Sequence, residues 1–136
     1  MLRSKQFASP PLVLLVCLCS APSTWATDLT GAWASDLSVC GKVFEKRGDT
    51  ISFAPTAELF GGGVLIEPEK ATGSFQKCKL KSIHRDGATI HVTAACSTGV
   101  MVSEMKFDVK IVGENQITIS PSGPVETEVP LVRCLM

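Results

Sequence analysis

Residues 101–112 alternate between apolar and charged side chains. The odd positions are apolar, interrupted only by Ser103, and the even positions from Glu104 to Lys110 are charged. A period of two residues is typical of a β-strand with one face buried and the other in water, and it argues against an amphipathic helix. This segment is therefore predicted to be a half-buried strand.

Shorter β-rich runs precede and follow this segment. The alternation recurs in 77–84 and 88–96, and shorter strands are expected at 31–34, 51–54, 63–67, 116–120 and 127–134. Turn-forming residues separate these runs, including a cluster at 69–73. This spacing predicts an all-β fold, a small antiparallel barrel or barrel-like meander of about seven to eight strands.

One segment near the start departs from the β pattern. Leu37, Cys40 and Phe44 recur at helical spacing, and Ser35 or Asp36 is available as the N-cap. We expect one short helix here, directly after the first strand. In this position it could plug one end of a barrel.

Residues 1–26 have the organisation of a cleavable export signal. Arg3 and Lys5 give a basic start, a short apolar run follows, and small residues precede the expected cleavage after Ala26. The apolar run is shorter than the roughly 18 residues that a membrane-spanning helix needs. The mature chain is therefore predicted to be a single domain, residues 27–136, that is periplasmic or secreted and has no membrane span.

The mature domain retains Cys40, Cys78, Cys96 and Cys134. An even count in a short exported chain favours two disulfides over a zinc site, since no two of these cysteines have C-x-x-C spacing. The turn at 86–87 lies midway between Cys78 and Cys96, so a hairpin would bring these two together and leave Cys40 to pair with Cys134. The two other pairings stay open.

The net charge of the domain limits its partners. Arg3 and Lys5 leave with the signal, so 11 of the 13 Lys and Arg residues remain against 13 Asp and Glu, a net charge of −2. This balance argues against nucleic acid and gives no reason to expect adsorption on anionic membranes. Lys77, Lys79 and Lys81 form a local basic stripe, either a solvated outer face or a candidate anion patch.

Few residues are candidates for catalysis. His84 and His91 are expected on neighbouring strands and on opposite faces, so they do not predict a metal site. A catalytic histidine would need a carboxylate partner, and Asp86, near His84 in the sequence, is more simply a turn residue. No catalytic residue, metal or cofactor is therefore predicted, although a hydrolase-type enzyme using His84 or His91 stays open.

The segment 54–63 has the composition of an interaction loop. Leu59 and Phe60 stand beside three glycines. An exposed apolar pair in a loop could meet a partner or guard a barrel mouth. The alternative is that Phe60 packs over the barrel end.

The motif Gly31-Ala32-Trp33 resembles the G-x-W motif of the calycins, the superfamily of lipocalin and avidin barrels. The resemblance implies that Trp33 packs at the closed end of a barrel, beneath an arginine from a late strand. Arg133 is the candidate partner, with its guanidinium over the indole face.

Two further resemblances concern exported bacterial proteins. The size, the export signal and the early cysteine resemble those of periplasmic metalloprotease inhibitors, which insert an N-terminal trunk into the protease, although only residues 27–30 precede the motif here. The mature sequence also resembles small uncharacterised exported proteins with a G-x-W-A…C opening, a likeness that implies no activity. We therefore expect a non-enzymatic periplasmic binding domain for a small apolar ligand or a protein partner, with a protease inhibitor as the first alternative.

Overall fold

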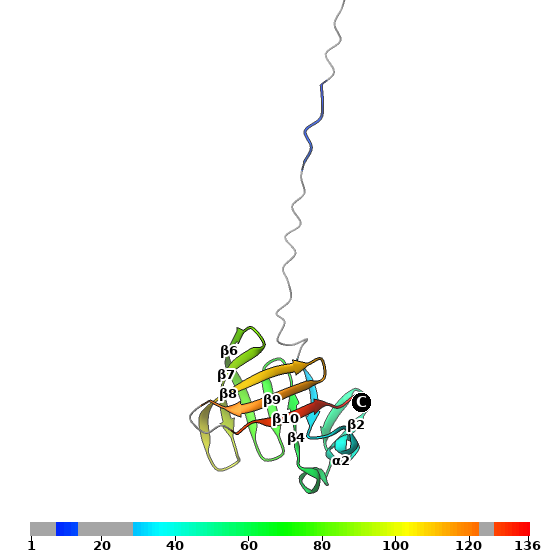
Figure 1. Ribbon diagram of the computed structural model, residues 1–136, viewed down its shortest axis with the longest axis vertical. Helices are drawn as coiled ribbons and strands as arrows, with labels where there is room; N and C mark the ends of the chain where they lie inside the picture. The colour runs from blue at the N-terminus through cyan, green and yellow to red at the C-terminus, as the bar shows by residue number, and fades with distance from the viewer. Residues whose placement is uncertain (1–7, 14–28, 123–126) are drawn as a thin grey trace, which may run out of the picture.

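The alternating segments of the sequence form a closed barrel of eight antiparallel strands, which confirms the predicted all-β class (Figure 1). The computed structural model describes residues 8–13, 29–122 and 127–136. In order around the barrel, the strands are β1 (Gly31–Ala34), β10 (Val129–Arg133), β9 (Gln116–Pro121), β8 (Val102–Gly113), β7 (Thr89–Ser97), β6 (Lys77–Asp86), β5 (Lys70–Gly73) and β4 (Gly63–Ile66). Strand β1 closes the barrel, because it pairs with both β4 and β10.

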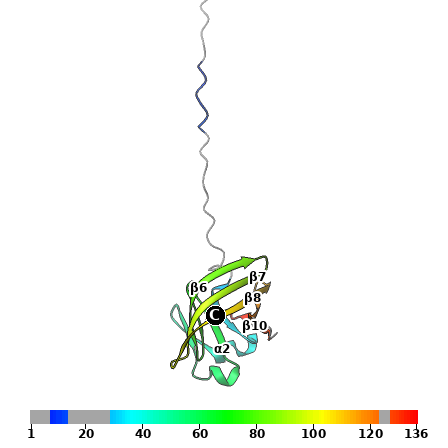
Figure 2. The same cartoon turned by 90° about the vertical axis from the view of Figure 1, so that its left-hand side faces the viewer.

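The period of two separates the inside of the barrel from the outside. On β7, Ile90, Val92, Ala94 and Cys96 point inward and are buried. The apolar odd positions of β8 face inward as well, because Met105 is in register with the buried Ala94. The two strands are paired along the whole length of β7. The long, curved strands β6 and β7 can be followed in Figure 2.

The predicted helix is present and short. It consists of a 3-10 turn, η1 (Leu37–Val39), followed by α2 (Cys40–Val43), and the chain then enters a separate two-stranded sheet, β2 (Phe44–Arg47) and β3 (Thr50–Phe53). The expectation that this helix plugs one end of the barrel is wrong. Val43 and Phe44 pack with Ala32 and Ala34, which are on the outer face of β1 because Trp33 between them points inward.

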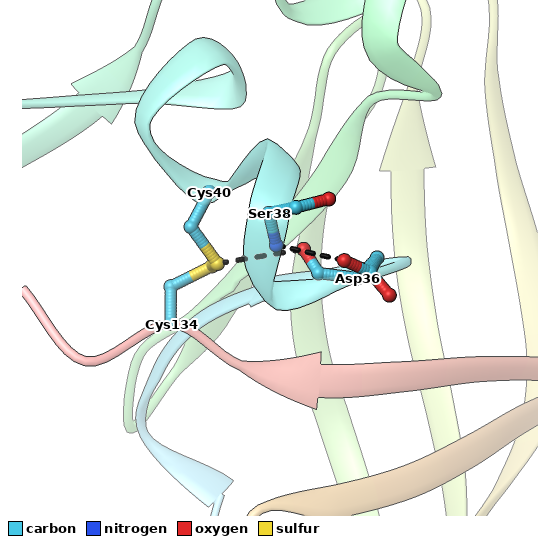
Figure 3. The surroundings of a disulfide bond; sticks show 4 residues. All are labelled: Asp36, Ser38, Cys40 and Cys134. Atoms are coloured by element: carbon cyan, nitrogen blue, oxygen red, sulfur yellow. Dashed lines mark hydrogen bonds between the residues drawn. A yellow bond between two sulfur atoms is a disulfide. The ribbon is translucent and has the colours of Figure 1, made fainter.

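A disulfide between Cys40 and Cys134, here called the clamp disulfide, joins α2 to the residue after β10 (Figure 3). Asp36 caps η1, and its carboxylate accepts a hydrogen bond of 2.7 Å from the backbone N–H of Ser38. Side-chain and backbone hydrogen bonds from Ser38 hold the pKa of Asp36 below its ordinary value. The clamp disulfide is the pairing that the sequence favours for these two cysteines, and it holds the small sheet against the barrel wall.

Two predicted segments exchange roles. The run at 51–54 forms β3 of the small sheet rather than a barrel strand, and the turn predicted at 69–73 is largely β5 of the barrel. Strand β5 has only four residues, and backbone pairing to both β4 and β6 holds it in place. Such pairing depends on the neighbours and leaves little trace in the side-chain pattern of the strand itself.

The predicted export signal lies outside the described residues except for 8–13, which form neither helix nor strand and are exposed. No helix of the described residues is long and apolar enough to cross a membrane.

Candidate binding site in the barrel interior

One end of the barrel interior is filled by a tryptophan and an arginine. The Trp33 ring is fully buried, and its indole N–H donates a hydrogen bond of 2.8 Å to the Leu29 carbonyl oxygen. The Arg133 guanidinium carbon lies 4.4 Å from the centre of that ring, and Arg133 Nη1 donates to the Thr30 carbonyl oxygen at 2.6 Å. This is the arrangement that the calycin resemblance implies for Trp33 and Arg133, and it closes this end of the barrel.

Trp33 packs in a core with Ile90, Val92 and Ile117, and a cavity lies beyond this core. A cavity of about 340 Å³ lies between the inward faces of β4 to β10 and opens to solvent. Most of its lining side chains are apolar, and the set is Val64, Ile66, Ala71, Gly73, Gln76, Cys78, Leu80, Cys96, Met105, Lys106, Phe107, Val109, Ile119, Pro121 and Val129. At ~30 Å³ for each water-sized group, this volume holds a ligand of about eleven non-hydrogen atoms. Pockets of about 300 Å³ and above with such linings are typical of small-molecule sites.

A second disulfide, Cys78–Cys96, forms part of the cavity wall and is here called the wall disulfide. The two cysteines are directly opposite in the register of β6 and β7. Cys96 is buried and Cys78 is half-buried, so their sulfur atoms add apolar surface to the lining. This is also the pairing that the sequence favours.

Polar groups are sparse in the lining. Gln76 and Lys106 are the polar residues among those that the structure assigns to the wall. Gln76 Nε2 lies 2.9 Å from Met105 Sδ, and the described lining includes no histidine and no carboxylate. The Lys106 side chain is on the outer face of β8, opposite Thr93, so Gln76 is the polar side chain near the opening. An apolar cavity with one amide near its opening can hold an apolar body and meet a polar head group, but it offers no acid–base pair for catalysis.

The two histidines are placed differently from the prediction. His84 and His91 are directly opposite in the β6–β7 register, and their rings are stacked with centres 6.2 Å apart, so they share the outer face of the barrel. A β-bulge between Leu80 and Ser82 is the reason. In an unbroken ladder, the register that sets Cys78 opposite Cys96 would have left the two histidines on opposite faces, and one extra residue reverses that parity.

His91 has the carboxylate partner that the sequence did not identify. Its Nδ1 lies 2.6 Å from Asp108 Oδ1, and Ser122 Oγ donates to the same oxygen at 3.2 Å. Asp86, the candidate suggested by the sequence, pairs with Thr89 beside the hairpin turn. The His91–Asp108 pair is on the outer wall and does not line the cavity. Within the described residues, no group of three metal-ligating side chains is present.

The basic stripe is divided by the same bulge. Lys77 and Lys79 point outward before it and are exposed. Lys81 lies at the bulge and forms an ion pair with Glu104 at 3.6 Å. Two of the three lysines of the candidate anion patch therefore share one outer face beside the cavity opening.

The candidate interaction loop contains a 3-10 helix, η2 (Ala57–Phe60). Phe60 is half-buried against the outer core, and the Lys42 ammonium lies 4.6 Å from the centre of its ring. Leu59 remains 81% exposed. The structure thus separates the two residues: Phe60 packs on the outer wall rather than over the barrel end, and Leu59 faces solvent.

The sequence pattern does not mark the cavity-lining residues as a site. Met105, Phe107 and Val109 indicate only the apolar face of a strand. Alternation marks an inward face but does not show whether opposing side chains meet and fill the space. No protein-family model, curated protein or solved structure matches this chain.

Proposed function

We propose that this protein is an extracytoplasmic, non-enzymatic binding protein that takes a small apolar ligand into its barrel. The observation that supports this most directly is the apolar cavity of about 340 Å³. Its walls come from seven strands, and Trp33 and Arg133 close the barrel at the end away from the opening. The calycin resemblance, in which barrels of this kind hold ligands inside, supports the same function.

The two disulfides support a location in an oxidising compartment outside the cytosol. Cystines persist in oxidising environments and are rare in the reducing cytosol. The clamp and wall disulfides together use all four cysteines of residues 27–136. We propose that the chain is exported, is cleaved near Ala26, and acts in the periplasm or outside the cell.

The other function classes have less support. A hydrolase using His91 would have the Asp108 partner, but this pair stands on the convex outer wall and away from the cavity. A trunk-type protease inhibitor would need a segment before the barrel that fits a protease cleft, and only four residues stand between the expected cleavage site and Gly31. The cavity therefore favours ligand binding.

The test fills the cavity with a side chain of the protein itself. Ala71 lines the cavity, so Ala71→Phe adds a phenyl ring that takes up about half of the space for eleven ligand atoms. Ala95, whose neighbours Lys79 and Glu104 are exposed, faces outward and supplies the matched control Ala95→Phe.

Binding of decanoate, which has twelve non-hydrogen atoms, is measured by displacement of a fluorescent apolar probe. Ala71→Phe is expected to weaken decanoate binding at least tenfold, whereas Ala95→Phe is expected to leave it unchanged. The proposal is wrong if the wild-type protein binds neither the probe nor decanoate, or if both variants behave alike while keeping the wild-type circular dichroism spectrum.

A further inference from the structure

Exposed apolar side chains gather on two loops at the open end of the barrel. Phe75 is 75% exposed in the β5–β6 loop, and Val100, Met101 and Val102 are 95%, 67% and 74% exposed in and after the β7–β8 loop. We call Phe75, Val100, Met101 and Val102 the apolar rim. Large apolar residues that are exposed and gather at loop tips are typical of an interaction site.

The strand register places the apolar rim at the mouth of the cavity. Lys77 pairs with Ser97, so the loops that hold Phe75 and Val100 follow from adjacent strands at the same end of the barrel. The β6–β7 hairpin, which points upward in Figure 1, is at the opposite end of these strands. The residues just after η2 also reach this end, because a Cβ added to Gly62 would lie 3.1 Å from Ser74 Oγ.

The rim is continuous with the cavity lining. Met105 and Val129 line the cavity and are also 37% and 47% exposed, so apolar surface runs from inside the barrel to its outer edge. An apolar ligand can therefore pass between the cavity and the rim along Met105, whose sulfur contacts Gln76 next to Phe75. This continuity matters for a ligand that is nearly insoluble in water.

Lysines stand next to the rim. Lys77 is two residues from Phe75, Lys79 shares its outward face, and Lys106 is exposed while contributing to the cavity lining. Glu104, the acidic residue nearest to the rim on β8, is paired with Lys81. Glu58, whose carboxylate lies near Ser74, is a further acidic residue at this end. The domain is slightly acidic as a whole, whereas the lysines beside the loop tips outnumber these two carboxylates. That combination fits a surface with anionic head groups over an acyl interior.

We propose that the apolar rim docks on the surface of an anionic lipid bilayer, and that the barrel takes from it a single-chain amphiphile with an anionic head. This proposal rests on the proposed ligand-binding function and names the source and class of the ligand. Phe75 and Val100 enter the head-group region, and the acyl chain passes along Met105 and Val129 into the cavity. The carboxylate or phosphate of the head group stays at the mouth, beside Gln76 and the exposed Lys77.

The test compares rim variants with a matched variant at the other end of the barrel. The double variant Phe75→Ser, Val100→Ser removes two rim side chains that are exposed, so the fold is not expected to change. Val112→Ser is the control, because Val112 is 59% exposed on β8 next to the β8–β9 turn, away from the mouth. Cosedimentation with phosphatidylcholine vesicles, with and without phosphatidylglycerol, measures docking. Decanoate binding in vesicle-free buffer is measured on the same proteins.

The wild-type protein and Val112→Ser are expected to sediment with the phosphatidylglycerol vesicles. The double variant is expected to lose binding about a hundredfold, since each buried side chain accounts for about tenfold, and it should keep the wild-type affinity for decanoate. Weak sedimentation with phosphatidylcholine alone is expected, because the lysines then have no anionic partner.

The other outcomes overturn the proposal in distinguishable ways. A wild-type protein that binds decanoate but no vesicles refutes the bilayer as the source and leaves the proposed function standing; the rim would then be a surface for a protein partner. Equal losses in the double variant and in Val112→Ser refute the rim as the docking surface. Vesicle binding without any decanoate binding refutes the proposed function and, with it, ligand uptake from the bilayer.

Discussion

The length of the acyl chain that the barrel binds most tightly follows from the size of its cavity. A volume of about 340 Å³ holds about eleven non-hydrogen atoms at ~30 Å³ each. Each methylene that moves from water into the cavity contributes about 0.8 kcal/mol, which is about fourfold in affinity. From hexanoate to decanoate, four methylenes are added, so the affinity is expected to rise about two-hundredfold.

Beyond about eleven atoms the remaining carbons have no cavity wall to contact. Affinity is therefore expected to level off between decanoate and dodecanoate and to stay nearly flat to hexadecanoate. Isothermal titration calorimetry below the micelle concentration of each acid measures the series. A constant slope through hexadecanoate, or no dependence on chain length from hexanoate upward, would refute the assignment of this cavity as the binding site.

Two further predictions concern stability, measured by urea denaturation of the oxidised protein. Replacing Cys40 and Cys134 by Ala opens a loop of 94 residues and the equivalent change at the wall disulfide opens one of 18, so the expected losses are about 4.7 and about 3.2 kcal/mol; the reverse order would contradict this reasoning. Gly63→Ala places a Cβ 2.5 Å from the Trp33 carbonyl oxygen and 2.7 Å from Phe44 Cζ, and it is expected to lower the free energy of unfolding by about 1–3 kcal/mol. Gly41→Ala, with no atom within 4 Å of the added Cβ, is the control and is expected to cause no loss.

The fold class followed from local patterns because the long strands are half-buried. In β7 the buried positions alternate with more exposed ones over nine residues, and in β8 charged and apolar side chains alternate from Glu104 to Ile111. The short strands carry no such signal. Strand β5 is held by its neighbours, and four residues that include a lysine and a glycine resemble a turn.

The faces of His84 and His91 could not be predicted from strict alternation along the strands. The wall disulfide and the His84–His91 pair both lie across the β6–β7 ladder, yet no single register accommodates both on the observed faces. The bulge between Leu80 and Ser82 resolves this, and nothing in the segment Leu80-Lys81-Ser82 distinguishes a bulge from continuous strand. The clamp disulfide does not determine the register of the β6–β7 hairpin, because it joins α2 to the residue after β10.

The cavity also gives the two disulfides a structural role in so small a domain. Because it opens to solvent, its cost lies below the upper bound of about 8 kcal/mol that missing contacts over a dry, closed void of about 340 Å³ would carry at ~24 cal/mol per Å³. That is comparable with the whole stability of a typical domain, about 5–15 kcal/mol. The clamp and wall disulfides together contribute about 8 kcal/mol by the chain-entropy relation, which offsets this cost. The wall disulfide joins the two strands that border the cavity, and the clamp holds the packed side of the barrel at β1 and β10. A barrel built only for stability would fill the space with larger side chains; one that binds a ligand keeps it open and is held by covalent links instead.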